Sequence, residues 1–227
     1  MIRFFFRIVR ERGLRFFYDY FVEALWFDFM HFTDTAMRVT KNDQESTVNS
    51  NHFNDGLLYV ASFTSVVKDT AELAITFCEK NLIPLGKFID LGCGKGKTLI
   101  LVDKYFRNFF PDGIVGIEYD SDLVFIGQSN LNKCKLSKEV SLIHDSATNV
   151  SNYISRSVPL IYLYNSFQGD TLYQVLKQLS LYEHLLIYVD PVEANELIQK
   201  NYVELNSNVG RYNADTWKLF HFKPNAK

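Results

Sequence analysis

Three glycines at alternate positions, Gly92, Gly94 and Gly96, follow a short apolar run and the acidic residue Asp90. A helix-like stretch, residues 98–107, comes directly after them. A strand, a glycine-rich turn and a helix in this order bring the backbone close to a nucleotide-like ligand in α/β folds. The run therefore predicts a ligand-binding loop, and the spacing of its residues indicates which ligand.

Two phosphate-binding loops have a similar spacing. A P-loop would end in Gly96-Lys97-Thr98 but needs a glycine five positions before Gly96, where Leu91 stands. A dinucleotide-binding loop needs a third glycine for close helix–strand packing, and the two registers put Lys97 or Leu99 there. A tight turn without a ligand is the remaining alternative, although three alternating glycines exceed what a turn requires.

The segment from Asp90 to Gly96 resembles motif I of the class I S-adenosylmethionine-dependent methyltransferases, D-x-G-x-G-x-G, throughout. This cofactor has no phosphate but carries an amino group and a sulfonium, which a carboxylate attracts. Glycines let the backbone approach such a ligand without Cβ clashes. The resemblance implies that Asp90, Gly92, Gly94 and Gly96 bind S-adenosylmethionine.

Polar residues also end the next two predicted strands. Glu118 stands 22 positions after Gly96 and can accept hydrogen bonds from both hydroxyls of a ribose, in NAD as well as in S-adenosylmethionine. A surface glutamate at a strand end is the alternative. The resemblance implies that Asp145 meets the adenine amino group, with Ser146 beside it, although an Asx turn would use the same residues.

The fourth predicted strand ends in Tyr164-Asn165-Ser166-Phe167. This segment resembles the Asn-Pro-Pro-Tyr/Phe motif of amino-methylating enzymes, and more closely the Tyr-Asn-Pro-Phe version of many bacterial members. By this resemblance the amide oxygen of Asn165 orients an N–H group for in-line displacement, and Phe167 stacks on the acceptor or shields it from water. Ser166 replaces the proline that stiffens the turn, so nitrogen specificity is open. An ordinary turn asparagine is the alternative.

Residues 27–35 and Tyr59 resemble the region before motif I in the same bacterial group. In related lysine methyltransferases this region closes over the cofactor. The resemblance predicts a lid formed by residues 31–62, with Asp34 and Tyr59 near the site.

The rest of the chain predicts the elements that position these residues. Apolar runs predict strands at 87–91, 113–118, 140–143, 158–164, 184–190, 201–206 and 216–222. Apolar residues repeating at three or four positions predict helices at 57–81, 97–107, 121–135, 170–182 and 192–200. The alternation indicates a Rossmann-like, doubly wound α/β fold with a mostly parallel seven-stranded sheet and helices on both faces. No clear helix separates the last two strands, so we expect the closing antiparallel hairpin of the methyltransferase fold.

Residues 1–40 have the pattern of an aromatic helix, and their first fifteen residues hold five arginines against one glutamate. A basic amphipathic helix can lie on a membrane surface or on an acidic partner. Packing on the core with solvated arginines is the simpler interpretation. We therefore expect an N-terminal helical cap and polar lid loop at 1–56 and a methyltransferase catalytic domain at 57–227.

Composition sets further bounds. The net charge of −2 gives no overall field that would favour nucleic acid as a partner. Three separated cysteines and five histidines without paired spacing predict neither a disulfide framework nor a metal site. No apolar stretch approaches the roughly 20 residues of a membrane-spanning helix, so a cytoplasmic protein is expected.

The sequence thus predicts methyl transfer from S-adenosylmethionine to an acceptor held near Asn165 and Phe167. The expected acceptor is a nitrogen of a protein lysine or a small molecule. Two other classes stay open, an NAD-dependent oxidoreductase and a non-catalytic cofactor-binding or scaffold protein.

Overall fold

The computed structural model describes residues 14–36 and 59–224. The first part of the predicted basic helix and residues 37–58 of the predicted lid lie outside these ranges. Among the described residues, no helix is long and apolar enough to cross a membrane.

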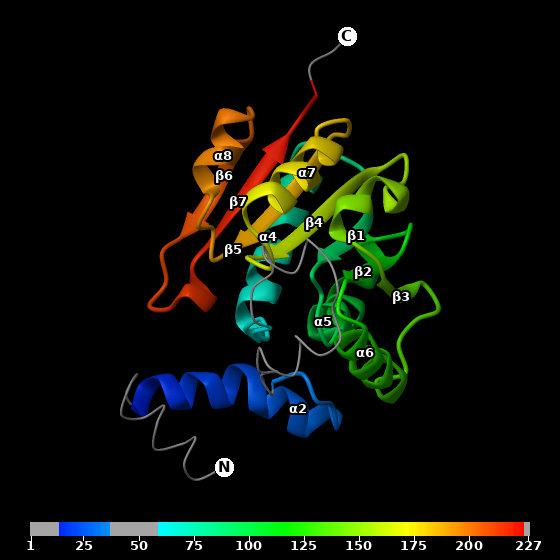
Figure 1. Ribbon diagram of the computed structural model, residues 1–227, viewed down its shortest axis with the longest axis vertical. Coiled ribbons are helices and arrows are strands. Elements are labelled where there is room, and N and C mark those ends of the chain that lie inside the picture. Colours follow the sequence, from blue (N-terminus) through cyan, green and yellow to red (C-terminus); the bar gives the residue numbers. More distant parts are fainter. Residues whose placement is uncertain (1–13, 37–58, 225–227) are drawn as a thin grey trace.

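Seven strands form one sheet in the order β3-β2-β1-β4-β5-β7-β6 (Figure 1). Five neighbouring strands are parallel, and β7 pairs antiparallel with both β5 and β6. The predicted mostly parallel sheet with a closing hairpin is therefore confirmed. The strands are β1 Leu85–Leu91, β2 Ile114–Glu118, β3 Val140–His144, β4 Val158–Tyr164, β5 His184–Val189, β6 Val203–Asn208 and β7 Trp217–Phe222.

Helices cover both faces of this sheet. Alternate residues of a strand point to opposite faces, so Phe88 of β1 packs in one core layer and Ile89 in the other. The first layer includes residues of α4 and α5, and the second includes residues of α7 and α8. The helices are α4 Thr64–Lys80, α5 Lys97–Phe106, α6 Ser121–Lys133, α7 Gly169–Leu179 and α8 Ala194–Gln199.

One predicted helix begins later than expected. The apolar pattern predicted a helix from residue 57, whereas α4 begins at Thr64. Phe63 has extended backbone angles, φ −69° and ψ 138°. Tertiary contacts use the residues before it, since the Ser62 carbonyl accepts a hydrogen bond from Lys97 and the Tyr59 hydroxyl donates to another segment. These contacts override the local helical pattern.

The N-terminal helix, residues 14–31, consists of an α-helical start, the π-helical turn η1 Phe21–Leu25 and the helix α2 Trp26–His31. It ends at Phe32, whose φ of 54° is left-handed. Figure 1 shows this helix in blue, lying across the end of the sheet at which the parallel strands finish. It therefore stands beside the strand ends that carry the predicted site.

Candidate functional site

The glycine loop, residues 92–96, turns between β1 and α5. Gly92, Gly94 and Gly96 have positive φ angles of 75°, 52° and 80°, where a side chain causes strain. The N–H groups of these three glycines all donate within the protein, that of Gly94 to the Glu118 carboxylate at 2.8 Å and the other two to backbone carbonyls. A bound phosphate relies on free amide donors. The three glycines therefore suit a ligand without phosphate.

Side chains of the protein fill the space next to two of these glycines. A Cβ at Gly92 would overlap with Ser166, and a Cβ at Gly94 would overlap with the ring of Tyr59. The Ser166 hydroxyl, which stands where the similar motif has proline, also donates to the Gly92 carbonyl at 3.4 Å. Internal packing therefore requires glycine at both positions, a reason that the sequence analysis missed.

Glu118, at the end of β2, lies with its carboxylate against the glycine loop. One oxygen accepts the Gly94 N–H, and the other accepts the N–H groups of Tyr119 and Asp120, both at 2.9 Å. Burial raises the pKa of Glu118, and the backbone hydrogen bonds from Asp120 and Gly94 oppose this rise. Each carboxylate oxygen can accept more than one hydrogen bond. The oxygen bound to Gly94 thus keeps capacity for a ligand hydroxyl, and ribose binding stays a prediction.

Asp90 precedes the loop and is only 3% exposed. Burial raises its pKa to about 8, a hydrogen bond with Thr98 lowers it, and the charge of Glu118 raises it further. Burial in this conformation therefore disfavours the charged form of the side chain. A nearby cation would favour the ionised form. The attraction of Asp90 to a cationic cofactor stays a prediction.

Asp145 and Ser146 form the turn that leads from β3 into the 3₁₀-helix η4 Ala147–Tyr153. One carboxylate oxygen of Asp145 accepts from the Ser146 N–H and the Asn149 amide at 2.7 Å, and the other accepts from the Tyr153 hydroxyl at 2.6 Å. Burial acts to raise the pKa of Asp145, but these hydrogen bonds outweigh it and lower the pKa. Asp145 thus accepts from the N–H of the next residue and from two side chains, whereas an Asx turn uses the N–H two residues on. Adenine binding stays a prediction.

Asn165 follows β4, and its side chain contacts a residue that the sequence analysis missed, Asp190. The register pairs Tyr164 with Val189, so the next residue of each strand lies beside the other. The Asn165 amide nitrogen donates to Asp190 at 2.9 Å, and its oxygen accepts from Gln168 at 3.1 Å. A carboxylate only accepts, so this contact fixes which end of the amide faces Asp190. The register of adjacent strand ends was the available signal.

Phe167, two residues after Asn165, is buried in the core. Its side chain is 6% exposed and belongs to the core layer of Ile89 and Leu172. A ring buried in this layer contributes apolar burial to the core. Its predicted role, stacking on the acceptor or shielding it from water, stays a prediction.

The segment before α4 contacts the glycine loop at several points. The Lys95 ammonium lies 3.1 Å from the Asp34 carboxylate, and the Tyr59 hydroxyl donates to the Thr35 carbonyl at 2.7 Å. Asn130 of α6 joins the same region: its amide oxygen accepts the Asp34 N–H at 3.0 Å, and its amide nitrogen donates to the Lys95 carbonyl at 3.1 Å. The structure thus brings Asp34 and Tyr59 to the loop, and their closing role stays a prediction.

Lys97, at the first position of α5, is buried and was also missed. Its ammonium donates to the Ser62 carbonyl at 2.7 Å and to the Glu23 carbonyl of the N-terminal helix, and it lies 5.2 Å from the centre of the Phe27 ring. Burial lowers its pKa to about 7. The lysine that would meet a phosphate in a P-loop therefore connects the N-terminal helix to the glycine loop.

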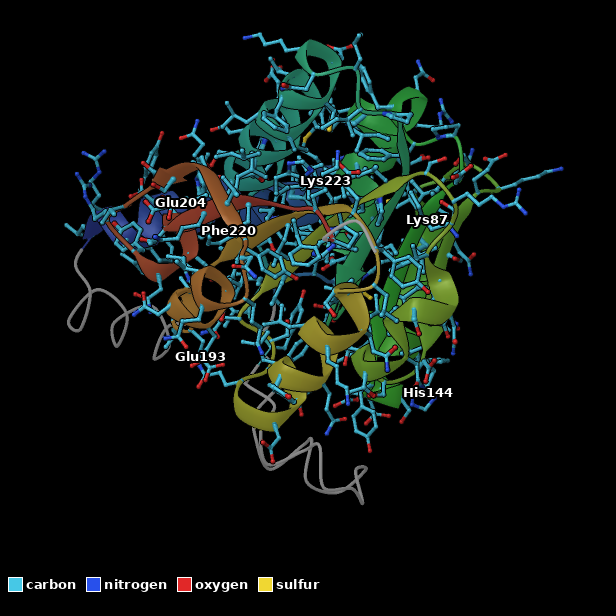
Figure 2. The ribbon with its side chains drawn as sticks, turned by 90° about the horizontal axis from the view of Figure 1, so that it is seen from above. Lys87, His144, Glu193, Glu204, Phe220 and Lys223 are labelled. Carbon is cyan, nitrogen blue, oxygen red and sulfur yellow. The ribbon has the colours of Figure 1, made fainter. Side chains whose placement is uncertain are left out.

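The histidine next to Asp145 contacts the residue that follows β2. His144 is exposed and its Nε2 lies 2.9 Å from the Tyr119 carbonyl. In Figure 2, His144 and Glu193, which follows β5, lie on opposite sides of α7. Within residues 14–36 and 59–224, no cluster of three or more His, Cys, Asp or Glu side chains could hold a metal ion.

The sequence and the structure of the chain were compared with those of known proteins. No protein-family model matches the sequence. Over 92 residues the chain is 25% identical to a probable S-adenosylmethionine-dependent methyltransferase, CRG1, of Saccharomyces cerevisiae. The match covers 40% of this chain and 30% of the yeast protein, so the chain spans less than a third of that relative.

Solved structures show a similar architecture. A proposed rRNA methylase of Clostridium thermocellum superposes with a TM-score of 0.51 at 13% identity, over 70% of this chain and 97% of that chain. An rRNA methylase of Streptococcus thermophilus has a TM-score of 0.48 at 10% identity, with 69% and 97% coverage. The strand order and the first of these superpositions show that the chain has the Rossmann-like fold of the class I methyltransferases. Over the matched segment, its sequence is similar to that of an S-adenosylmethionine-dependent enzyme.

Proposed function

We propose that this protein transfers the methyl group of S-adenosylmethionine to an acceptor at the carboxyl ends of β4 and β5. One observation carries the proposal most directly: the glycine loop of a methyltransferase-like sheet is hydrogen-bonded to Glu118 at the next strand end. Similarity to the yeast protein supports the same cofactor.

The residues at the strand ends fit this cofactor by their chemistry. Glu118 keeps acceptor capacity for ribose hydroxyls, and Asp145 offers carboxylate oxygens at the next strand end. The glycine N–H groups already donate within the protein, so a pyrophosphate would lack the donors that it uses in dinucleotide folds. When bound, the cofactor supplies an electrophilic methyl group. These observations favour S-adenosylmethionine over NAD.

We further propose a nitrogen atom of the acceptor as the methylated group. Hydrogen bonds to Asp190 and Gln168 hold the Asn165 amide in one orientation, and its oxygen keeps a lone pair that can accept an N–H. Such orientation directs the nitrogen lone pair at the methyl group. A neutral amine needs little assistance from a base, because a sulfonium is a strong electrophile.

Titration calorimetry tests which cofactor the protein binds. We expect S-adenosylhomocysteine to bind and NAD to produce no heat, and the reverse result would indicate an oxidoreductase. Tight binding of S-adenosylhomocysteine without methyl transfer to any component of a lysate would instead favour a non-catalytic scaffold. Exchange of Glu118 for Gln should weaken binding about tenfold, since a neutral amide accepts ribose hydroxyls less strongly.

Incubation of the protein with S-adenosylmethionine that carries a labelled methyl group, in a fractionated lysate, tests the chemical class of the acceptor. We expect the label in a protein or small-molecule fraction, on nitrogen. The low net charge led us to expect no nucleic acid, but a proposed rRNA methylase shares this fold, so charge alone does not exclude RNA. Label that is released by ribonuclease and retained after protease treatment would contradict the proposed acceptor.

A further inference from the structure

The outward face of the N-terminal helix is apolar, which is unusual for a helix at a protein surface. Buried residues of this helix repeat at three or four positions, as expected for packing on the domain: Phe16, Tyr20, Ala24 and Phe27. The opposite face should then be polar. Instead it exposes eight large apolar side chains: Leu14, Tyr18, Phe21, Val22, Trp26, Phe29, Met30 and Phe32.

The aromatic residues of this outward face form a continuous cluster. The rings of Trp26 and Phe29 stack with their centres 5.5 Å apart, and Phe21 lies 6.3 Å from Trp26. Trp26 is 48% exposed and Phe29 is 68% exposed. Contiguous exposed apolar surface of this kind marks a site of contact with another surface. Tryptophan and tyrosine in particular are enriched where an apolar medium meets water.

The acidic side chains of the helix are held by other groups of the protein. Asp19 accepts from the Tyr212 hydroxyl at 3.0 Å, and Glu23 accepts the Ser65 N–H at 2.9 Å. Asp28 accepts hydrogen bonds from the turn that follows the helix, including one from the Thr35 N–H at 2.8 Å. All three carboxylates of the described helix are therefore hydrogen-bonded within the protein.

The sequence is rich in arginine at and before the start of the described helix. The first fifteen residues contain five arginines and one glutamate, and the side chain of Arg15 is 72% exposed. Helices that combine tryptophan, phenylalanine and leucine with nearby arginine bind in the plane of anionic membranes.

We propose that residues 14–32 of this helix dock the protein on an anionic lipid bilayer, with the apolar face entering the headgroup region. The basic segment of residues 1–15 adds attraction to the lipid phosphates. The same helix lies across the carboxyl ends of the parallel strands, so docking places these strand ends near the lipid surface (Figure 1). This proposal does not depend on methyl transfer.

Co-flotation of the full chain with lipid vesicles tests this surface. We expect at least tenfold stronger association with vesicles that contain phosphatidylglycerol than with pure phosphatidylcholine, and weaker association in 0.5 M salt, a concentration that reduces the screening length to about 4 Å. Exchange of Trp26 and Phe29 for Ser should reduce association more than tenfold, because both rings lose apolar area to bury. Phe125→Ser is the matched control, since Phe125 on α6 is 75% exposed and lies outside this face.

Tryptophan fluorescence gives a second measurement. The chain has two tryptophans, and Trp217 is buried, so a blue shift on adding anionic vesicles should come from Trp26. The shift should vanish in Trp26→Phe, which keeps an apolar ring and should still float with the vesicles. Equal flotation of wild type and the Trp26→Ser, Phe29→Ser variant would overturn the proposal. A dimer in solution that this double variant converts to monomer would overturn it too, by assigning the face to a second copy.

Discussion

Asn165 and Asp190 both have left-handed backbone angles, with φ of 35° and 49°, at the ends of two adjacent strands. Asn and Asp are the non-glycine residues that tolerate this region best. Such conformations persist where the surrounding structure determines them, often at functional sites. Their side chains meet at 2.9 Å, so the carboxylate of Asp190 positions the amide of Asn165.

Removal of the Asp190 side chain should therefore reduce turnover. We expect Asp190→Gly to lower kcat at least tenfold, because the Asn165 amide loses its fixed partner, while glycine accepts the positive φ without strain. Asp190→Asn should stay within about threefold of wild type, since its amide oxygen can accept the same hydrogen bond. The affinity for S-adenosylhomocysteine should be unchanged in both. Equal rates for Asp190→Gly and wild type, in the methyl-transfer assay, would contradict this role.

The sequence pointed to Asn165 but not to its partners. A motif names residues that are neighbours along the chain, whereas Asp190 and Gln168 reach Asn165 through strand register and the turn into α7. Lys97 was missed for a similar reason. Its sequence context suggests a phosphate ligand, but only the folded chain brings two carbonyls to its ammonium.

Lys97 makes folding stability depend on pH. Its pKa is lowered to about 7 by burial, while an unfolded lysine has a pKa near 10.4. Between these values the unfolded chain binds the proton and the folded chain does not, so stability rises with pH. Lys97→Met should lose about 1–3 kcal/mol at pH 7, because two buried carbonyls lose their donor. This loss should grow by roughly 2 kcal/mol at pH 9, where the wild type no longer carries the desolvation cost.

Urea unfolding of both proteins at pH 7 and pH 9 measures this effect. Lys104→Met is the control, since Lys104 lies on the same helix with an exposed side chain. A difference between wild type and Lys97→Met that does not change with pH would show that the buried ammonium stays protonated.

At the scale of elements, the alternation of apolar runs and helical repeats predicted the sheet, its hairpin and the order of the helices. The start of α4 could not be predicted in this way. Residues 59–63 have the apolar spacing of a helix, yet they lie outside α4 and make contacts with Thr35 and Lys97 instead. Element boundaries set by tertiary hydrogen bonds lie beyond a local pattern.

The segments before α4 provide a test of the predicted lid. We expect Tyr59→Phe, which loses the hydrogen bond to Thr35, and Asp34→Ala, which loses the ion pair with Lys95, to weaken S-adenosylhomocysteine binding about three- to tenfold. Calorimetric titration measures this, with Asp122→Ala as a surface control on α6. Normal cofactor binding and turnover in both variants would end the lid interpretation.

His184 connects β5 to the chain that enters the closing hairpin. It is fully buried, its ring nitrogens lie 2.9 Å from the Tyr182 carbonyl and the Tyr202 hydroxyl, and it stacks on Phe222. Burial lowers its pKa to about 4. The unfolded chain therefore binds a proton between pH 6.5 and 4 that the folded chain excludes, and stability falls as pH falls through this range.

Acid denaturation should show this contribution. From pH 7 to pH 5 the wild type should lose roughly 2 kcal/mol through this site, whereas His184→Asn has no group that titrates there. Denaturant midpoints at the two pH values give the difference. The exposed His144→Asn should lose as much stability as the wild type, and identical pH dependence of His184→Asn and wild type would exclude His184 as the cause.

At the scale of the whole molecule, the glycine loop lies between parts of the chain that are distant in sequence. Asn130 of α6 and Glu118 of β2 contact the loop directly, and the N-terminal helix contacts Lys97, the residue that follows the loop. A ligand bound only by the folded chain stabilises it by about 2.7 kcal/mol at one hundred times its dissociation constant. S-adenosylhomocysteine should then raise Tm by roughly 5–10 °C. NAD at the same concentration should leave Tm unchanged, and a shift with NAD alone would contradict the proposed cofactor.

The contact between Asp19 and Tyr212 joins residues 193 positions apart, and this distance has a consequence during translation. At about 5–20 residues per second, the ribosome needs on the order of 10–40 s to make the intervening chain. Throughout that time the N-terminal helix lacks its contacts with the closing hairpin, whereas its partners Ser65 and Lys97 are synthesised much earlier. Docking of this helix therefore finishes only after the hairpin has been synthesised. Until then Phe16, whose ring meets that of Tyr212 edge-on at 4.9 Å, lacks this partner.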